Sequence, residues 1–190
     1  HLDLEADLPD WCKWAIKAAI RPEIIAFLRF KPELLHTADS TADANAWPTP
    51  RSWEMASNVL CGVAKRRNTV LLSGTSEFEA QLLDGTVGEG AASDLIGFLR
   101  HFRQLPSIDE ILLNPATAPV PTETSAQIAV ATALGRVLTD NSIRRGLTYL
   151  DRMPTEMRIM AVRDAAARDV AITHTPEFIQ FGVEYREVLQ

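Results

Sequence analysis

The chain has 190 residues, of which 46% are hydrophobic and 23% charged, and its formal net charge is −6. This length suits one domain or a domain with an extension, and the hydrophobic fraction is ordinary for a globular core. A broad nucleic-acid-binding surface needs clustered lysine and arginine, which a net negative charge disfavours. The local basic run Lys65-Arg66-Arg67 also suits the last turn of a helix, so no nucleic-acid partner is expected.

Cysteine usage and hydropathy indicate the cellular compartment. Cys12 and Cys61 both lie in apolar helical patterns, so we expect two buried free thiols rather than a disulfide. Neither has a histidine at ligand spacing, so no metal site is expected. No apolar run approaches the roughly 20 residues of a membrane span. These features predict a cytoplasmic protein with no membrane partner.

The first five residues alternate between apolar and polar, as the end of a β-strand does: His1-Leu2-Asp3-Leu4-Glu5. A lone strand has nothing to pair with here, so we interpret the chain as the downstream part of a longer protein. The alternative is that His1 derives from a vector and precedes a natural start.

Helix signals dominate the chain after residue 5. A first helix is predicted from Asp7-Leu8-Pro9-Asp10, a second from Arg21-Pro22, and a short turn after Pro32. Residues 37–47 are small and polar, which predicts a surface loop. Thr49-Pro50 then begins a strong helix, because threonine is a good N-cap and proline suits the first helical position.

Further helices are predicted from about 76 to 85, from about 91 to 102 after a turn at Gly88-Glu89-Gly90, and from 107 to 114. Residues 115–121 contain three prolines, which favour an extended linker. Four more helices are predicted beyond it. The expected fold is an all-α bundle of about eight to ten helices, with at most a short residual strand at the N-terminus. We predict a helical domain over 1–114, a linker over 115–121 and a helical extension over 122–190.

Motifs that would supply a complete active site are absent from the sequence. It contains no GxxxxGK[ST] phosphate loop, no HExxH zinc motif and no GxSxG nucleophile elbow. The four histidines are scattered, and none lies four residues from another. No catalytic residue is therefore predicted, and a small helical enzyme is the least favoured class of function.

Arg51 lies in the first turn of the helix predicted from Thr49-Pro50. A helix N-terminus directs N–H groups and positive dipole outward and so attracts anions such as phosphate. A guanidinium adds a charge-assisted contact, although arginine is otherwise electrostatically unfavourable at this end. We consider Arg51 a phosphate contact, supported by the cap at Thr49 and Pro50. The alternative, that Arg51 is merely a solvated first-turn residue, stays open.

Pro48-Thr49-Pro50-Arg51 and the helix after it resemble the sensor-2 region of AAA+ ATPases of the MoxR-like branch, where an (S/T)PR sequence opens a helix of the α-helical lid. Other segments are similar to bacterial and phage-encoded members of this family. These are residues 7–11, 21–30, 31–35, 88–90 with 98–99, and 153–156.

The resemblance implies that Arg51 is a sensor-2 arginine, which contacts ATP phosphates held by an ATPase core upstream of His1. ATP and Mg²⁺ would then bind only together with that core and not to this chain alone. The implied partners are the core, neighbouring subunits of a ring, and an unidentified client protein to which hydrolysis is transmitted. The residues alone also permit a stand-alone helical protein–protein interaction module with no nucleotide role.

Overall fold

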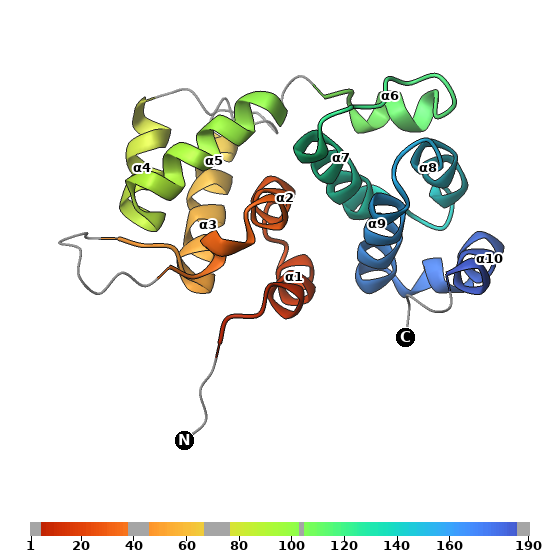
Figure 1. The fold of residues 1–190 in the computed structure, drawn as a ribbon, viewed down its shortest axis with the longest axis horizontal. Helices are drawn as coiled ribbons and strands as arrows, with labels where there is room; N and C mark the ends of the chain where they lie inside the picture. Colours follow the sequence, from red (N-terminus) through yellow and green to blue (C-terminus); the bar gives the residue numbers. More distant parts are fainter. Residues whose placement is uncertain (1–4, 38–45, 67–76, 103–104, 186–190) are drawn as a thin grey trace. The chain divides into compact units, whose positions relative to one another are not determined.

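The computed structural model describes residues 5–37, 46–66, 77–102 and 105–185. Within these ranges the chain forms ten α-helices and two 3₁₀-helices and no β-strand, which confirms the predicted all-α class (Figure 1). Residues 1–4 of the predicted strand-like segment lie outside the described residues.

The chain divides into two compact units, His1–Gln104 and Leu105–Gln190. The sequence instead placed the division at the proline-rich segment 115–121. In the structure that segment belongs to the second unit, and Ala118 within it is buried. The preceding helix also joins the second unit, because its Ile111 is fully buried in that unit's core.

Side chains of the second unit hold the proline-rich segment in place through its carbonyl groups. The Tyr149 hydroxyl donates to the carbonyl of Pro119 at 2.7 Å. The Arg152 guanidinium donates to the carbonyls of Pro115 at 2.9 Å and Ala118 at 2.8 Å. Proline removes a backbone donor but keeps its acceptor, so a proline-rich segment can be packed firmly by donors from elsewhere.

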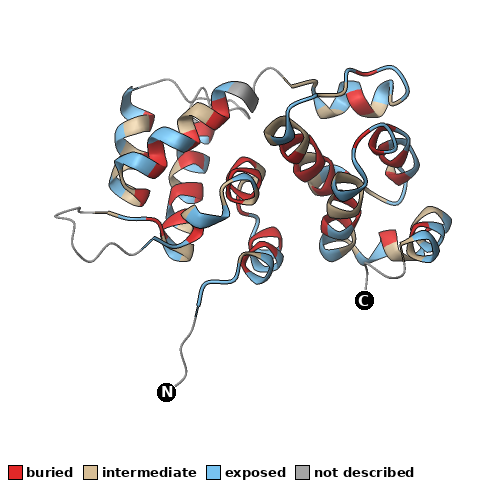
Figure 2. Ribbon diagram, in the orientation of Figure 1, coloured by how far each residue is buried: buried red, intermediate tan, exposed pale blue. Residues whose placement is uncertain are grey.

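The first unit is built around α2, whose residues 23–28 are all buried. The Phe27 ring lies 5.6 Å from the Trp53 ring and 5.7 Å from the Phe98 ring, which joins α2 to α3 and α5. Figure 2 shows these buried faces. The elements of this unit are α1 (Leu8–Lys17), α2 (Pro22–Phe30), η1 (Pro32–Leu35), α3 (Pro50–Arg66), α4 (Glu77–Val87) and α5 (Glu89–Phe102).

Gly88 alone separates α4 from α5, with φ at 84°. The predicted three-residue turn is therefore too long, since Glu89 and Gly90 already belong to α5. A Cβ atom at position 88 would lie 2.6 Å from the carbonyl oxygen of Ala46. Glycine is required here both by the left-handed backbone and by the close approach of residue 46.

The second unit packs α7 closely against α9. A Cβ atom on Gly135 of α7 would lie 2.7 Å from Cβ of Asp164 and 3.0 Å from the carbonyl of Ala161, both on α9. This close approach is possible because Gly135 has no side chain at the crossing. The elements of this unit are α6 (Ile108–Leu113), α7 (Thr124–Val137), α8 (Ile143–Leu150), α9 (Thr155–Arg168), η2 (Val170–His174) and α10 (Pro176–Glu184).

Candidate functional site

The start of α3, which carries Arg51, is closed by two side chains that cap each other's backbone. The Thr49 hydroxyl accepts the N–H of Ser52 at 3.0 Å, and the Ser52 hydroxyl accepts the N–H of Thr49 at 2.7 Å. The Ser52 hydroxyl also lies 3.1 Å from the carbonyl of Trp47. The sequence pointed to Thr49 but missed Ser52, which occupies the position where a capping box usually has glutamate or glutamine.

Neighbouring elements also hold this helix start. The indole N–H of Trp11 in α1 donates to the carbonyl of Pro50 at 3.3 Å. The indole N–H of the fully buried Trp53 donates to the carbonyl of Leu34 in η1 at 2.8 Å. The backbone N–H of Thr37 donates to the carbonyl of Pro48 at 3.1 Å. The backbone that carries Arg51 is thus bound to two other elements of the first unit.

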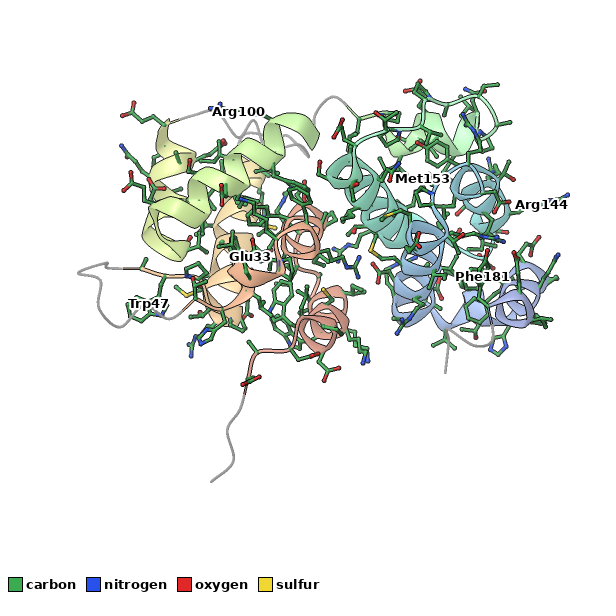
Figure 3. The ribbon with its side chains drawn as sticks, in the orientation of Figure 1. Glu33, Trp47, Arg100, Arg144, Met153 and Phe181 are labelled. Carbon is green, nitrogen blue, oxygen red and sulfur yellow. The ribbon has the colours of Figure 1, made fainter. Side chains whose placement is uncertain are left out.

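Arg51 itself is exposed. Within the described ranges its guanidinium forms no hydrogen bond or ion pair, and the first turn of α3 contains no acidic residue. The guanidinium is therefore available to an external anion. Trp47, just before the helix, is also 45% exposed, and Figure 3 labels it.

The first turn of α3 has fewer free backbone N–H groups for an anion than the sequence suggested. Pro50 has no N–H. The N–H of Ser52 is bonded to Thr49 Oγ1, and the N–H of Trp53 is bonded to the carbonyl of Thr49 at 3.1 Å. The capacity to hold a phosphate therefore depends on the Arg51 side chain rather than on a cluster of free N–H groups.

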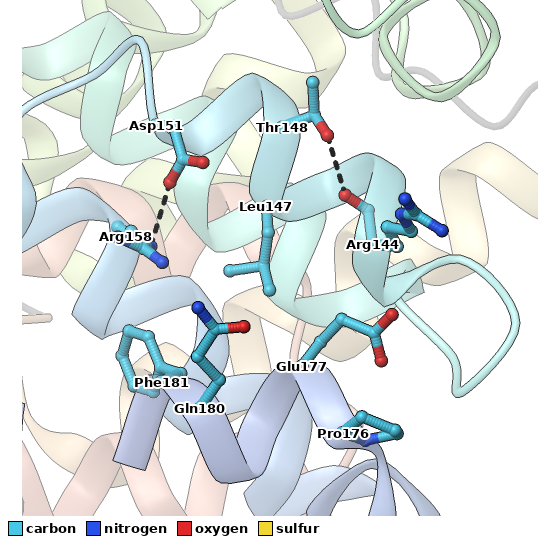
Figure 4. Close-up of a pocket in the computed structure, with 9 residues that line it drawn as sticks. All are labelled: Arg144, Leu147, Thr148, Asp151, Arg158, Pro176, Glu177, Gln180 and Phe181. Carbon is cyan, nitrogen blue, oxygen red and sulfur yellow. Dashed lines mark hydrogen bonds and ion pairs between the residues drawn. The ribbon is translucent and has the colours of Figure 1, made fainter. Parts of the chain in front are cut away.

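A second feature, which sequence reasoning missed, is a hollow of about 340 Å³ between helices of the second unit (Figure 4). Arg158 on α9 lies at one side of it. Its Nε is 3.1 Å from a carboxylate oxygen of Asp151, and its Nη1 is 3.3 Å from a carboxylate oxygen of Glu184. The guanidinium carbon also lies 5.4 Å from the ring centroid of Phe181 and 5.2 Å from that of Tyr185. Arg158 therefore links α9 to α10.

Tyr149 of α8 has a pKa above the ordinary value of a phenol. Burial raises the pKa of its phenol, and the nearby Arg152 guanidinium partly opposes that rise. The phenol is fully buried and donates to the Pro119 carbonyl, so it stays protonated at neutral pH and acts as a structural donor.

In the described part of the chain no group of three or more histidine, cysteine or acidic residues is placed to hold a metal ion. Neither Cys12 nor Cys61 forms a disulfide, and Cys12 is buried, but Cys61 is exposed, so the expectation of two buried thiols was wrong for Cys61. Over the same ranges, no helix has both the length and the apolar character needed to cross a membrane.

Comparison with known proteins identifies no relative of this chain. No protein-family model, curated protein or solved structure matches the chain. The function proposed below is therefore argued from the residues and from their geometry.

Proposed function

We propose that this chain is the lid region of a cytoplasmic AAA+ ATPase of the MoxR-like type, with Arg51 as its sensor-2 arginine. The observation that carries the proposal is that the exposed Arg51 guanidinium lies on a helix start held by hydrogen bonds. The first turn of α3 is capped by Thr49 and Ser52 and is bonded to Trp11 of α1. The resemblance of residues 48–51 to the (S/T)PR sequence of that family supplies the identity of the anion, a phosphate group of ATP.

A sensor arginine works best when its backbone is fixed before the nucleotide arrives, because less freedom is then lost on contact. The mutual caps of Thr49 and Ser52 and the indole bond from Trp11 provide such a fixed base. The guanidinium forms charge-assisted hydrogen bonds to phosphate oxygens. ATP and Mg²⁺ would be held by an upstream core, and this chain alone would contribute only Arg51.

The fixed start of α3 also explains how contact between Arg51 and a phosphate could move the rest of the first unit. Trp53, one turn after the cap, packs against Phe27 with its ring tilted, and both side chains are fully buried in the first unit. A displacement of Arg51 at its phosphate would move α3 together with α2, since protein interiors are closely packed and resist local deformation. In this account a neighbouring ring subunit or a client protein receives that movement.

The second candidate is a stand-alone helical interaction module. It is favoured by apolar side chains that α10 leaves in solvent, namely Ile179 at 58% and Val183 at 76% exposure. They lie four residues apart and so fall on one side of the helix. In this reading Arg51 is a solvated residue, and the protein needs no nucleotide.

ATP turnover by the longest natural product that contains this chain separates the two candidates. The variants are Arg51→Ala and, as the control, Arg100→Ala, which removes another exposed arginine of the first unit. A loss of turnover confined to Arg51→Ala supports the lid. Equal turnover in all three proteins, or no turnover in any, leaves the interaction module.

A further inference from the structure

The bend between α4 and α5 is made at a single residue. Helical hairpins usually have about two to five connecting residues, whereas here only Gly88 lies outside both helices. Two hydrogen bonds already join Gly88 to its neighbours with helical spacing. The Gly88 N–H donates to the carbonyl of Asp84 at 3.0 Å, and the Ala92 N–H donates to the carbonyl of Gly88 at 2.9 Å. The chain therefore bends at Gly88, whose φ is 84°.

A change of φ at Gly88 to a negative value would join α4 and α5 into one helix from Glu77 to Phe102. The N–H groups of residues 89, 90 and 91 would then donate to the carbonyls of residues 85, 86 and 87, because an α-helix bonds each N–H to the carbonyl four residues before it. Glycine adopts negative φ as readily as positive φ. The backbone of Gly88 therefore permits both a bent and a straight form.

The packing of α4 and α5 prevents a single copy from straightening. Leu83 and Val87 of α4 and Leu95 of α5 are at most 1% exposed, and Phe98 of α5 lies 5.7 Å from the Phe27 ring of α2. Figure 1 shows α4 beside α3 and α5, with which it packs. Straightening would expose these side chains, at a cost that three hydrogen bonds do not offset. A second copy, straightened in the same way, carries the same surfaces and restores these contacts.

We propose that Gly88 is a hinge at which two copies of this chain exchange α5 and the residues that follow it. In the exchanged dimer each α4 continues into α5 as one helix, and that α5 packs on α2 and α4 of the other copy. The partner is a second copy because it carries the surface that α5 covers in the monomer, and exchange of an identical element is a low-cost route to a dimer. Monomer and dimer bury the same core, so the two junctions and the protein concentration decide the balance between them. The proposal does not depend on the role of Arg51.

Gly88→Ala should favour the exchanged dimer. Alanine disfavours a positive φ, and its Cβ would meet the carbonyl oxygen of Ala46, but it is well suited to the straight helix. The left-handed conformation disfavours alanine by about tenfold at each junction, and a dimer relieves two junctions, so the association constant should rise at least about a hundredfold. Concentrated samples are warmed until the dimer fraction no longer changes, and analytical ultracentrifugation then measures monomer and dimer. In dilute solution the variant stays monomeric and is only less stable than the parent.

The controls are Gly85→Ala in α4 and Gly90→Ala in α5, where an added Cβ has no neighbour within 4 Å. Both residues are helical in the bent and the straight form, so neither substitution should change the association constant by more than about threefold. Gly88→Asn is the second hinge variant. Asparagine tolerates a positive φ better than alanine does, so its association constant should lie between those of the parent and Gly88→Ala.

A charge swap distinguishes exchange from ordinary association. Lys31, directly after α2, and Asp94 of α5 form an ion pair at 2.6 Å, which joins two different chains in the exchanged dimer. Lys31→Asp and Asp94→Lys, each made in the Gly88→Ala protein, place like charges together in their own homodimers and opposite charges together in the mixed dimer. The equilibrium should therefore shift toward the mixed dimer by at least about threefold over random mixing. Native mass spectrometry, with one of the two proteins ¹⁵N-labelled, measures the three dimers.

Three results would overturn the proposal. The first is a folded Gly88→Ala protein that dimerises no more than the parent, and the second is equally strong dimerisation of Gly90→Ala. The third is random mixing in the charge-swap experiment. If Gly88→Ala does not fold, the same comparisons are made with Gly88→Asn and decide the question in the same way.

Discussion

Thr49 and Ser52 each accept the other's backbone N–H, at distances of 3.0 and 2.7 Å. The pair closes the first turn of α3 on both sides of Arg51, so the chain cannot fray at that residue without breaking two hydrogen bonds. The stability of this turn and the proposed role of Arg51 are therefore linked.

Ser52→Ala should destabilise the first unit by about 1–2 kcal/mol, because the Thr49 N–H loses its acceptor. Chemical unfolding followed by circular dichroism measures the change. Asn58→Ala, on the exposed side of the same helix, is the control and should stay within about 0.5 kcal/mol of the parent. Equal effects of the two substitutions would mean that the mutual cap contributes little.

Gly88→Ala should destabilise the protein by at least about 2 kcal/mol, since alanine disfavours a positive φ and its Cβ would meet the Ala46 carbonyl. Gly90→Ala provides a matched comparison two residues away, inside α5, where an added Cβ has no neighbour within 4 Å. It should instead stabilise the helix by about 0.5–1 kcal/mol. Thermal unfolding of both variants gives the sign of each effect, and two changes of the same sign would contradict the geometry described for Gly88.

Tyr149 should make stability depend on pH in the alkaline range. Burial raises the pKa of its phenol above the ordinary value of 10.0, so the unfolded chain loses this proton at a lower pH than the folded chain. The stabilisation is complete below pH 10.0 and is lost as the pH rises through the folded-state pKa.

Tyr149→Phe is the variant that isolates this effect. It should lose about 1 kcal/mol at neutral pH, because the Pro119 carbonyl loses its donor. Its stability should also fall less steeply than that of the parent above pH 10.0. Urea unfolding across this range measures both, and parallel pH profiles for the two proteins would contradict the assignment.

Arg158→Gln should loosen α10, because it removes ion pairs to Asp151 and Glu184 and the contact with the Phe181 ring. Exposed pairs are individually weak, but Arg158 is largely buried, so we expect a total loss of about 1–3 kcal/mol. Faster hydrogen exchange confined to α10 is the sharper measurement. Arg163→Gln, an exposed arginine of the same helix, should leave the exchange of α10 unchanged.

The helix starts were predictable because their signals are local. Asp7, Ser107 and Thr175 each accept an N–H three residues further along the chain, at 2.8, 3.1 and 3.2 Å. A cap of this kind depends only on nearby residues and their backbone, so it can be read from a short stretch of sequence.

Features that depend on distant residues could not be predicted in this way. The proline-rich segment belongs to the second unit because Tyr149, 30 residues after Pro119, donates to its carbonyl. Arg158 meets Glu184 and Tyr185 across 26 and 27 residues. Cys61 follows the buried Leu60 and therefore lies on the exposed side of α3. The apolar residues around it in the sequence do not show which side of the helix it occupies.

The rate of ATP hydrolysis with and without the Arg51 guanidinium tests the central claim most directly. Turnover would be measured on the longest natural product containing this chain, as the parent and as Arg51→Ala, with assembly checked by size-exclusion chromatography. A lost phosphate contact in the transition state is worth about 2–4 kcal/mol, so turnover should fall on the order of a hundredfold while assembly stays intact. Unchanged turnover in Arg51→Ala would contradict the role proposed for this arginine.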